Sequence, residues 1–415
     1  MEKTRIVITG IGIVSPIGIG KDFFWQSLKE GKSGVKPITL FDVSKYKVKV
    51  GGEISDFDPE EILGKRGLLD LDRSTKLLLS SAKLALDDAG LEINEENSSR
   101  MGVSVGTTLG GLDSYSKLQR EAFIEGPKYT NPSHFPNVGV NSPASRVGIK
   151  FKITGFNSTI STGMCSALDA LGYACDFIKL NRIHTGMVGA VEDFSIEAFL
   201  GGYKLQYLSG FNGKNDPISC PFDKNRNGIV LAEGASTFVV EEIGEALKRK
   251  AHIYGEILGM ASCFDPAHLY KYNPKGQGMI RAMRMALKDA DLNPVDIDCI
   301  FANANSTQDA DKIEVKAIKE VFGDKAKTVP VTSVKSNIGE SFSVSGGFSL
   351  AAALGVMEED FIPSLINYAE QDPDCDLNFV LGENKNQKLS HVSKIMVNTF
   401  SFNGAHSVAI IGKLK

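Results

Sequence analysis

Residues 161–174 read STGMCSALDALGYA and predict the end of a strand, a turn at Gly163 and then a helix. Small residues recur along that helix: Ser166, Ala167, Ala170 and Gly172. A residue at such a turn lies beside the helix N-terminus, where free backbone N–H groups and the positive end of the helix dipole favour a thiolate. The turn therefore suits a cysteine nucleophile, yet the residue that follows Gly163 is Met164.

Two further segments have a comparable layout. Residues 301–318, FANANSTQDADKIEVKAI, predict a strand, a polar loop and a helix. Residues 333–354, SVKSNIGESFSVSGGFSLAAAL, predict a Lys-Ser-Asn turn that opens onto a helix. That helix is so rich in Gly, Ser and Ala that we expect it to pack very closely against its neighbours.

The rest of the chain alternates short apolar runs with segments of helical periodicity. Strands are predicted at residues 5–12, 101–107, 183–191, 234–241 and 296–304. Helices are predicted at residues 21–30, 72–89 and 276–291. From residues alone, this alternation predicts a large α/β protein.

These segments, together with residues 221–242 and 398–410, resemble the elongating β-ketoacyl-acyl-carrier-protein synthases, condensing enzymes of the thiolase superfamily. The resemblance covers nearly the whole chain and several motifs in the family's order. It implies the thiolase fold, a duplicated five-layer α-β-α-β-α arrangement. It also implies an N-terminal thiolase-like half over residues 1–250 and a C-terminal thiolase-like half over residues 251–415, although no internal sequence repeat is evident.

The resemblance assigns the catalytic positions of the family one by one. Counting back from the helix glycine places the nucleophilic cysteine of the family at Met164. The His-Gly-Thr-x-Thr loop maps onto residues 303–307, so its histidine is Asn303. The Lys-Ser-x-x-Gly-His segment puts the second histidine at Glu340. Of the usual Cys-His-His-Lys set, only Lys335 remains.

The three replacements remove the chemistry of condensation. That reaction needs a thiolate to hold the acyl chain and two imidazole donors to stabilise an enolate. The Met164 thioether has no ionisable proton, Asn303 does not shuttle protons near neutral pH, and ionised Glu340 repels an enolate. Residues that act as a unit fail together, so we expect no catalysis by this site. We expect Lys335 to form a buried ion pair with Glu340 instead.

Two other residues near this site have competing interpretations. A register shift of one residue would make Cys165 the nucleophile, but neighbours on a helix point about 100° apart, so Cys165 is expected to face away as a small buried thiol. Phe400 matches the gating aromatic of the family. The alternative for Phe400 is an ordinary core position in a strand.

Composition narrows the class of protein. The chain has 415 residues, 42% hydrophobic residues and a formal net charge of -4, which argues against nucleic acid or an anionic membrane as a partner. No stretch of sequence is apolar enough to span a bilayer. The six cysteines follow no zinc or disulfide spacing, so we expect no metal, no cofactor and a cytoplasmic location.

Within the family, the chain is closest in character to a chain-length factor, the ketosynthase β-subunit of type II polyketide and polyene systems. The resemblance then implies an active ketosynthase as heterodimer partner, acyl carrier protein as a second partner, and a role in shaping the acyl tunnel. These subunits typically carry Gln at the nucleophile position, so Met164 departs from their pattern. The resemblance also places His268 near the tunnel mouth, where the family contacts the carrier-protein arm.

In the family, the segment after the Gly110-Gly111 turn reaches the dimer interface. The side chains that we expect to form the tunnel floor are Tyr115, Leu118, Phe123, His134 and Phe135. For each of them, the alternative is an ordinary core or surface position.

Three functions remain open at this stage. The leading one is a catalytically degenerate chain-length factor. The second is an atypical β-ketoacyl-acyl-carrier-protein synthase or acyltransferase that uses Cys165, with Glu340 as a base. The third is a homodimeric protein that binds acyl groups or carrier protein.

Overall fold

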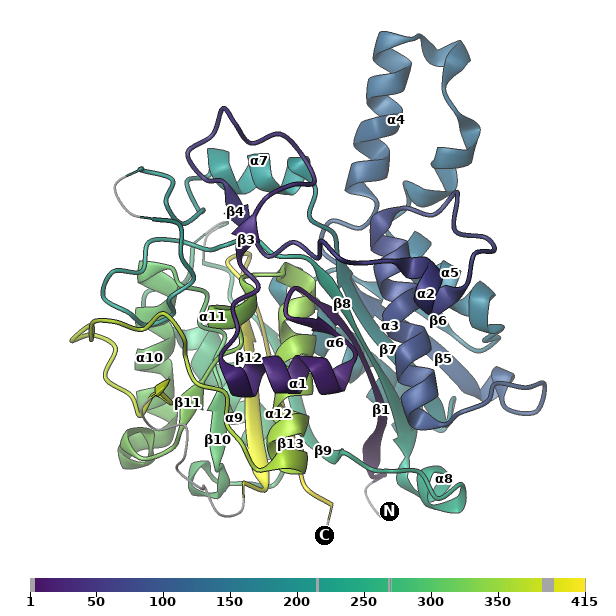
Figure 1. The fold of residues 1–415 in the computed structure, drawn as a ribbon. Coiled ribbons are helices and arrows are strands. Elements are labelled where there is room, and N and C mark those ends of the chain that lie inside the picture. Colours follow the sequence, from purple (N-terminus) through teal and green to yellow (C-terminus); the bar gives the residue numbers. More distant parts are fainter. Residues whose placement is uncertain (1–3, 214–215, 268, 270, 383–391, 415) are drawn as a thin grey trace.

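The computed structural model describes residues 4–213, 216–267, 269, 271–382 and 392–414. Its centre is an 11-stranded mixed sheet in the order β11-β10-β12-β13-β9-β1-β8-β7-β5-β6, with β2 paired to β1 (Figure 1). The strands are β1 (Ile6–Ser15), β2 (Gly18–Ile19), β5 (Met101–Gly106), β6 (Asn157–Ile160), β7 (Thr185–Glu192), β8 (Gly234–Glu242), β9 (Gly255–Phe264), β10 (Cys299–Phe301), β11 (Val331–Thr332), β12 (Lys394–Phe400) and β13 (Ala405–Gly412). A separate two-stranded sheet pairs β3 (Lys36–Pro37) with β4 (Val50–Gly51).

Helices flank and separate the strands. They are α1 (Lys21–Glu30), α2 (Pro59–Leu63), α3 (Arg73–Ala89), α4 (Leu112–Ile124), α5 (Ser142–Phe151), α6 (Ser166–Lys179), α7 (Ile196–Lys204), α8 (Ile243–Lys248), α9 (Gln277–Asp289), α10 (Gln308–Phe322), α11 (Lys335–Ile338) and α12 (Ser345–Glu359). None of the helices in the described ranges is both long and apolar enough to cross a membrane.

The large sheet consists of two halves with the same internal order. One half runs β1-β8-β7-β5-β6 and the other β9-β13-β12-β10-β11. In each half the first two pairings are antiparallel and the last two are parallel. The halves join where β1 meets β9 in a short antiparallel pairing of Val7 with Glu256 and Ile8 with Gly255. The architecture is therefore duplicated although the sequence shows no repeat.

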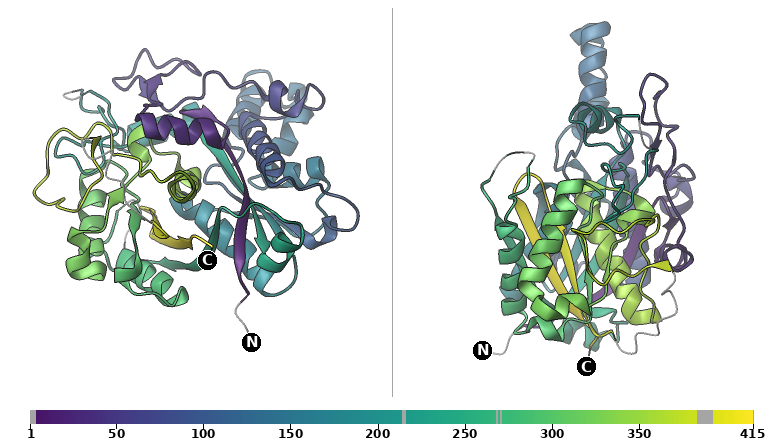
Figure 2. Two further views of the ribbon diagram at one scale, coloured as in Figure 1. Left: turned by 60° about the horizontal axis from the view of Figure 1, so that its bottom comes forward. Right: turned by 90° about the vertical axis from the view of Figure 1, so that its left-hand side faces the viewer.

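Helices complete the layers. Helix α3 packs on β1, β8 and β7, and α9 packs on β9 and β13. Helices α6 and α12 contact each other, with α6 against β5 and β7 and α12 against β12 and β8, so they form the inner layer (Figures 1 and 2). The thiolase fold expected from the sequence is confirmed.

The inner helix α12 packs as closely as its composition predicted. A Cβ atom on Gly347 would lie 2.0 Å from Ser236 Oγ, and one on Gly346 would lie 2.8 Å from Thr399 Cγ2. Larger side chains at these positions would push α12 away from strands β8 and β12. The small residues are thus what allows one helix to sit between two halves of a sheet.

The predicted elements agree closely with the observed ones, with one clear exception. Residues 21–30 form a helix with the predicted bounds. Helix α3 begins one residue later than predicted because Asp72 accepts a hydrogen bond from Thr75 N at 2.9 Å and caps the helix. The strand predicted over residues 296–304 is too long, since only Cys299–Phe301 pairs and the chain then turns at Ala304 with φ of 41°.

One segment projects far from the rest of the molecule. Helix α4 leaves the body after β5, and the chain returns through the 3-10 helices η2 (Pro127–Tyr129) and η3 (Pro132–Asn137) (Figures 1 and 2). We call residues 112–137 the α4 projection. Its length and its position at the edge of the fold expose most of its side chains.

Candidate functional site

The turn around Met164 is a strand-to-helix elbow. Strand β6 ends at Ile160, Gly163 adopts φ of 67°, and a 3-10 turn over Gly163–Cys165 leads into α6. Ser166 Oγ accepts a hydrogen bond from Thr162 N at 3.0 Å and donates one to Gly163 O at 2.7 Å. The elbow thus holds Met164 at the start of the helix, with 1% of its surface exposed.

Tyr272 occupies the space in front of Met164. Its hydroxyl lies 3.9 Å from Met164 Sδ, donates to Phe400 O at 3.0 Å and accepts from Asn305 Nδ2 at 3.4 Å. The same tyrosine lines an outer cavity of about 760 Å³, together with residues such as Tyr207, and Met164 is not among the residues lining it. Tyr272 therefore lies between the cavity and Met164.

Asn303, Lys335 and Glu340 are brought together as the resemblance implied. Lys335 Nζ donates to Asn303 Oδ1 at 3.1 Å and forms an ion pair with Glu340 Oε2 at 2.8 Å. The side chains of Lys335 and Glu340 are only 3% and 1% exposed. The expected buried ion pair is therefore present. Asn303 Oδ1 also accepts from Phe400 N at 3.1 Å, so its carbonyl is fully engaged.

The second oxygen of Glu340 is also occupied. Glu340 Oε1 accepts from Ser345 Oγ at 2.7 Å and from Phe342 N at 3.0 Å. A carboxylate with a counter-ion and two further donors is held rigidly as an acceptor. It is poorly suited to act as a base, because each of its oxygens already has a donor.

A second buried carboxyl group, which sequence reasoning missed, shapes the loop that begins at Asn303. Glu314 Oε1 accepts from Asn303 N and Glu314 Oε2 from Ala304 N, each at 2.8 Å. Burial raises the pKa of Glu314 to about 7, while those backbone N–H groups act in the opposite direction. The sequence feature that could have indicated Glu314 is an acidic residue on the buried face of α10, two residues after Lys312.

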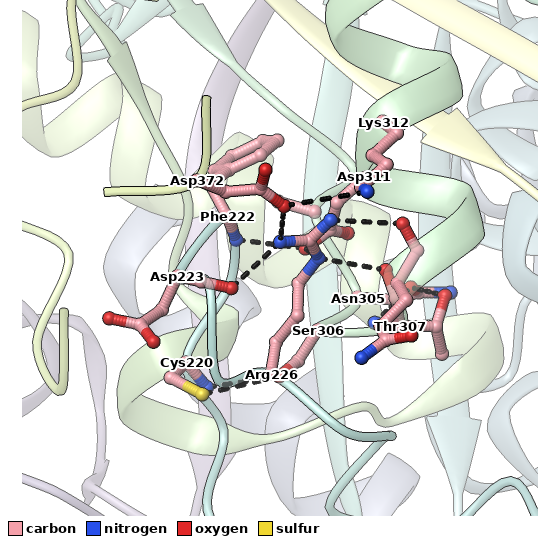
Figure 3. A network of polar contacts seen from close by, with 12 residues as sticks. Cys220, Phe222, Asp223, Arg226, Asn305, Ser306, Thr307, Asp311, Lys312 and Asp372 are labelled. Carbon is pink, nitrogen blue, oxygen red and sulfur yellow. Dashed lines mark hydrogen bonds and ion pairs between the residues drawn. The ribbon is translucent and has the colours of Figure 1, made fainter. Parts of the chain in front are cut away.

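Arg226 fixes the far end of the same loop from behind (Figure 3). Its guanidinium is fully buried and donates to Thr307 O at 3.2 Å and to Gln308 O at 2.9 Å. Asp372 provides an ion pair at 2.7 Å, and Asp311 lies 3.5 Å away. Burial raises the pKa of Asp311 to about 6, and the positive charge of Arg226 lowers it. Arg226 and Glu314 thus hold the two ends of the loop that carries Asn303.

Cys165 faces away from Met164. It is fully buried, and its Sγ lies 3.2 Å from both Thr399 O and Ala405 O, to which the thiol donates. Burial raises the pKa of this thiol far above its ordinary value. A thiolate at Cys165 is therefore strongly disfavoured. All six cysteines are free, and the described residues contain no group of three His, Cys, Asp or Glu side chains placed to hold a metal ion.

Phe400 lies in the core. Its side chain has no exposed surface, and its ring stands 5.4 Å from the ring of His406 in an edge-on arrangement. Its backbone N–H donates to Asn303 Oδ1 and its backbone carbonyl accepts from the Tyr272 hydroxyl, which links both residues to strand β12. Gating by this aromatic stays a prediction.

The candidate tunnel residues all lie on the α4 projection, away from the site around Met164. Tyr115, Phe123 and Phe135 are 47%, 92% and 69% exposed. Leu118 is half-buried, as is His134, whose Nδ1 lies 3.3 Å from Glu121 Oε1. Their role as a tunnel floor stays a prediction. His268 lies outside the described residues.

Comparisons with known proteins agree on one family. Residues 3–246 match the model described as "Beta-ketoacyl synthase, N-terminal domain", and residues 254–369 match "Beta-ketoacyl synthase, C-terminal domain". The chain is 36% identical to "3-oxoacyl-[acyl-carrier-protein] synthase 2" of Coxiella burnetii, with all of both chains covered. It is 34% identical to "Tetracenomycin polyketide synthase ketoacyl synthase alpha subunit" of Streptomyces glaucescens, with 100% of this chain and 98% of the relative covered.

Two solved structures cover the whole chain. "The ishigamide ketosynthase/chain length factor" superposes with a TM-score of 0.92 at 29% identity, with all of both chains covered. A complex described as "type II PKS acyl-carrier protein in complex with its ketosynthase bound to the hexaketide" superposes with a TM-score of 0.89 at 28% identity, again over both full chains.

Proposed function

The chain belongs to the β-ketoacyl synthase family, and on that premise we propose that it is a catalytically degenerate member that acts as a chain-length factor. It pairs with an active ketosynthase of type II polyketide, polyene or fatty-acid-like biosynthesis. In that pair the partner performs condensation on acyl carrier protein, and this chain shapes the acyl tunnel.

The observation that carries the proposal is the replacement of a reactive site by a packed and neutralised one. Met164 is enclosed behind Tyr272, and Lys335 is bound to Glu340 and Asn303. Among the described residues no imidazole or thiolate contacts Met164, so this part of the chain supplies neither an acyl acceptor nor an enolate stabiliser there. A chain with the fold of the family but without these groups at the site is consistent with a role for the surface of the molecule.

The α4 projection supports pairing as that role. Beyond the tunnel candidates it exposes Ile124 and Tyr129, which are 72% and 69% exposed. A cluster of large apolar side chains on a projecting element is costly in water and is typical of a protein interface. The ishigamide structure, whose description names both a ketosynthase and a chain length factor, has the same overall fold.

The two alternatives have less support. Catalysis through Cys165 needs a thiolate that can reach an acyl group, whereas the thiol is buried and donates to two backbone oxygens. A homodimeric carrier of acyl groups needs a path to a binding cavity, and Tyr272 closes the path from the outer cavity to Met164.

The first experiment measures condensation by the purified chain with malonyl and acyl carrier proteins. We expect no ketoacyl product above a blank without protein. Product that disappears in the Cys165→Ala variant would overturn the proposal in favour of the atypical synthase.

A second experiment restores the missing groups. The triple variant Met164→Cys, Asn303→His and Glu340→His is expected to give at most slight acylation by a radiolabelled acyl carrier protein, because Tyr272 still blocks access. Adding Tyr272→Ala to the triple variant is expected to raise acylation. Robust turnover by the triple variant alone would mean that Tyr272 does not close the site.

The third experiment tests assembly and product length. Coexpressed with an active ketosynthase from the same biosynthetic system, the chain is expected to form a one-to-one heterodimer in preference to a homodimer. Within it, changing Leu118 or Phe123 to Ala is expected to shift the product mass distribution and leave the acylation rate of the partner nearly unchanged. Phe23→Ala is the matched control, since Phe23 is 72% exposed but lies on α1. A persistent homodimer, or a change in rate without a change in length, contradicts the proposal.

A further inference from the structure

A groove of about 330 Å³ opens at the base of the α4 projection, away from Met164. Its walls come from α4, from the start of α7 and from the loop that joins β7 to α7. Leu40, Phe41, Phe194 and Ile196 supply apolar walls. The charged residues that line it are Arg73, Asp113, Lys117, Arg120, Asp193 and Glu197.

Two acidic side chains of this groove have oxygens without a hydrogen-bond partner in the described part of the chain. Asp193 is only 5% exposed, and its Oδ1 is buried without a hydrogen-bond partner among the described residues. Glu197 Oε1 accepts from Ser116 Oγ, but Glu197 Oε2 is buried and lacks a partner among the same residues. Buried polar atoms in native proteins are nearly always paired, so two unpaired acceptors in one groove need an explanation.

The surroundings of Asp193 disfavour the ionised form of its carboxyl group. Burial raises the pKa of Asp193 well above its ordinary range, and the negative charges of Glu192, Asp113, Asp72 and Glu233 raise it further. A buried carboxyl group without a hydrogen-bond donor lowers the stability of the fold. A donor supplied by another molecule would remove this cost.

Two of the three basic side chains that line the groove form ion pairs with acids other than Asp193 and Glu197. Arg73 forms a two-pronged ion pair with Glu233, at 2.7 and 2.6 Å, and Lys117 pairs with Asp113 at 2.7 Å. Within the described part of the chain, Arg120 has neither an ion pair nor a side-chain hydrogen bond, and its side chain is exposed on α4. The charge of Asp193 raises the pKa of Arg73, but the hydrogen bonds of the Arg73 guanidinium go to Glu233 and to Ile54 O.

We propose that this groove receives an arginine side chain of the partner subunit. The enclosed carboxyl groups of Asp193 and Glu197 turn toward its guanidinium, which donates to Asp193 Oδ1 and Glu197 Oε2, and its aliphatic stem packs against Phe41 and Phe194. A guanidinium presents several N–H donors in a fixed plane and suits two separate acceptors. The groove is continuous with the α4 projection, whose exposed apolar side chains provide the rest of the contact. The choice of partner rests on the proposed heterodimer.

The test uses the full chain and n-butylguanidinium as the probe, with uncharged n-butylurea as its control at equal ionic strength. We expect saturable binding of n-butylguanidinium by isothermal titration calorimetry and none of n-butylurea. Asp193→Asn and Glu197→Gln are each expected to weaken that binding about tenfold, as the loss of one charge-assisted hydrogen bond implies. Glu245→Gln, on α8, is the matched surface control and is expected to change nothing.

The melting temperature distinguishes a variant that has lost the binding site from one that has lost its fold. Asp193→Asn removes an unpaired buried acid, so the melting temperature of the empty variant is expected to equal or exceed that of the parent chain. Equal binding by parent and Asp193→Asn overturns the proposal. Binding that emerges only after Arg120→Ala also overturns it, because Arg120 would then fill the groove itself.

Heterodimer formation is measured in parallel with the active ketosynthase, where Asp193→Asn is expected to weaken the complex about tenfold. If the ketosynthase binds but n-butylguanidinium does not, the groove proposal alone fails. If n-butylguanidinium binds and the ketosynthase does not, the heterodimer proposal fails and the groove remains a guanidinium site.

Discussion

The resemblance maps Glu340 onto a histidine position of the family, and the contacts of Glu340 show how a carboxylate is accommodated there. A carboxylate beside Lys335 gains a counter-ion, and Ser345 and Phe342 supply donors to its other oxygen. Asn303 completes the group by accepting from Lys335. The side chains at 303 and 340 are thus mutually consistent, since each supplies an acceptor to Lys335.

We expect Glu340→Met to lower the free energy of unfolding by about 3–5 kcal/mol, because it leaves the buried Lys335 charge without its counter-ion. The double variant Lys335→Met, Glu340→Met is expected to recover most of that loss, since no charge then remains. Urea denaturation of the single and double variants measures both effects. The control is Asp87→Ala, which breaks the exposed Lys83–Asp87 pair and is expected to cost about 0.5 kcal/mol.

His406 makes the stability of the chain sensitive to acid. Burial lowers the pKa of His406 to about 4, with Asp265 acting in the opposite direction. Between pH 4 and 6.5 the unfolded chain binds the proton and the folded chain does not, so stability falls as pH falls through this window. The loss amounts to about 3 kcal/mol when the window has been crossed.

We therefore expect His406→Gln to flatten the decline in unfolding free energy between pH 6.5 and pH 4. Denaturation curves at several pH values check this. His252→Gln, at a side chain that is 57% exposed, serves as the control. An unchanged decline in the His406 variant would assign the acid sensitivity to other groups.

At the scale of elements, the two inner helices begin in the same way. A 3-10 turn over Gly163–Cys165 precedes α6, and one over Phe342–Val344 precedes α12. Gly163 and Phe342 both have positive φ, 67° and 44°. The duplication of the fold is therefore visible in the local geometry of its central turns, although the residues differ.

The serines that close these two turns are expected to differ in importance. Ser166→Ala loses the bond from Thr162 N and the donation to Gly163 O, both between uncharged groups, and is expected to cost about 1–2 kcal/mol. Ser345→Ala loses the bond from Ser341 N and also a donor to Glu340, so we expect about 2–3 kcal/mol. Equal losses of unfolding free energy for the two variants would mean that the hydrogen bond from Ser345 does little to stabilise the Glu340 carboxylate.

At the scale of the whole molecule, the two halves of the chain share one interior. The largest cluster of buried apolar side chains combines Ile8, Phe24 and Leu168 with Leu354 and Ile411. The inner helix α12 contacts β8 as well as β12. The predicted division into residues 1–250 and 251–415 stays a prediction, and the shared core argues that neither half is stable alone.

We expect a fragment of residues 1–250 to lack a cooperative unfolding transition, because the surface that covers α12 would be exposed to water. The full chain is expected to unfold in a single transition followed by circular dichroism. A sharp thermal transition of the fragment would contradict this expectation and support independent halves.

The sequence by itself determined the type and approximate place of the predicted strands and helices, because local periodicity encodes them. The resemblance to the family added the expected layout, the mapping of Met164, Asn303 and Glu340 onto its reactive positions, and the expectation of the Lys335–Glu340 pair. Only the tertiary structure placed Tyr272 against Met164, 108 residues away, and brought Asp193 and Glu197 into one groove with oxygens that no described residue pairs. Such contacts depend on how distant elements pack, and no spacing along the chain encodes that distance.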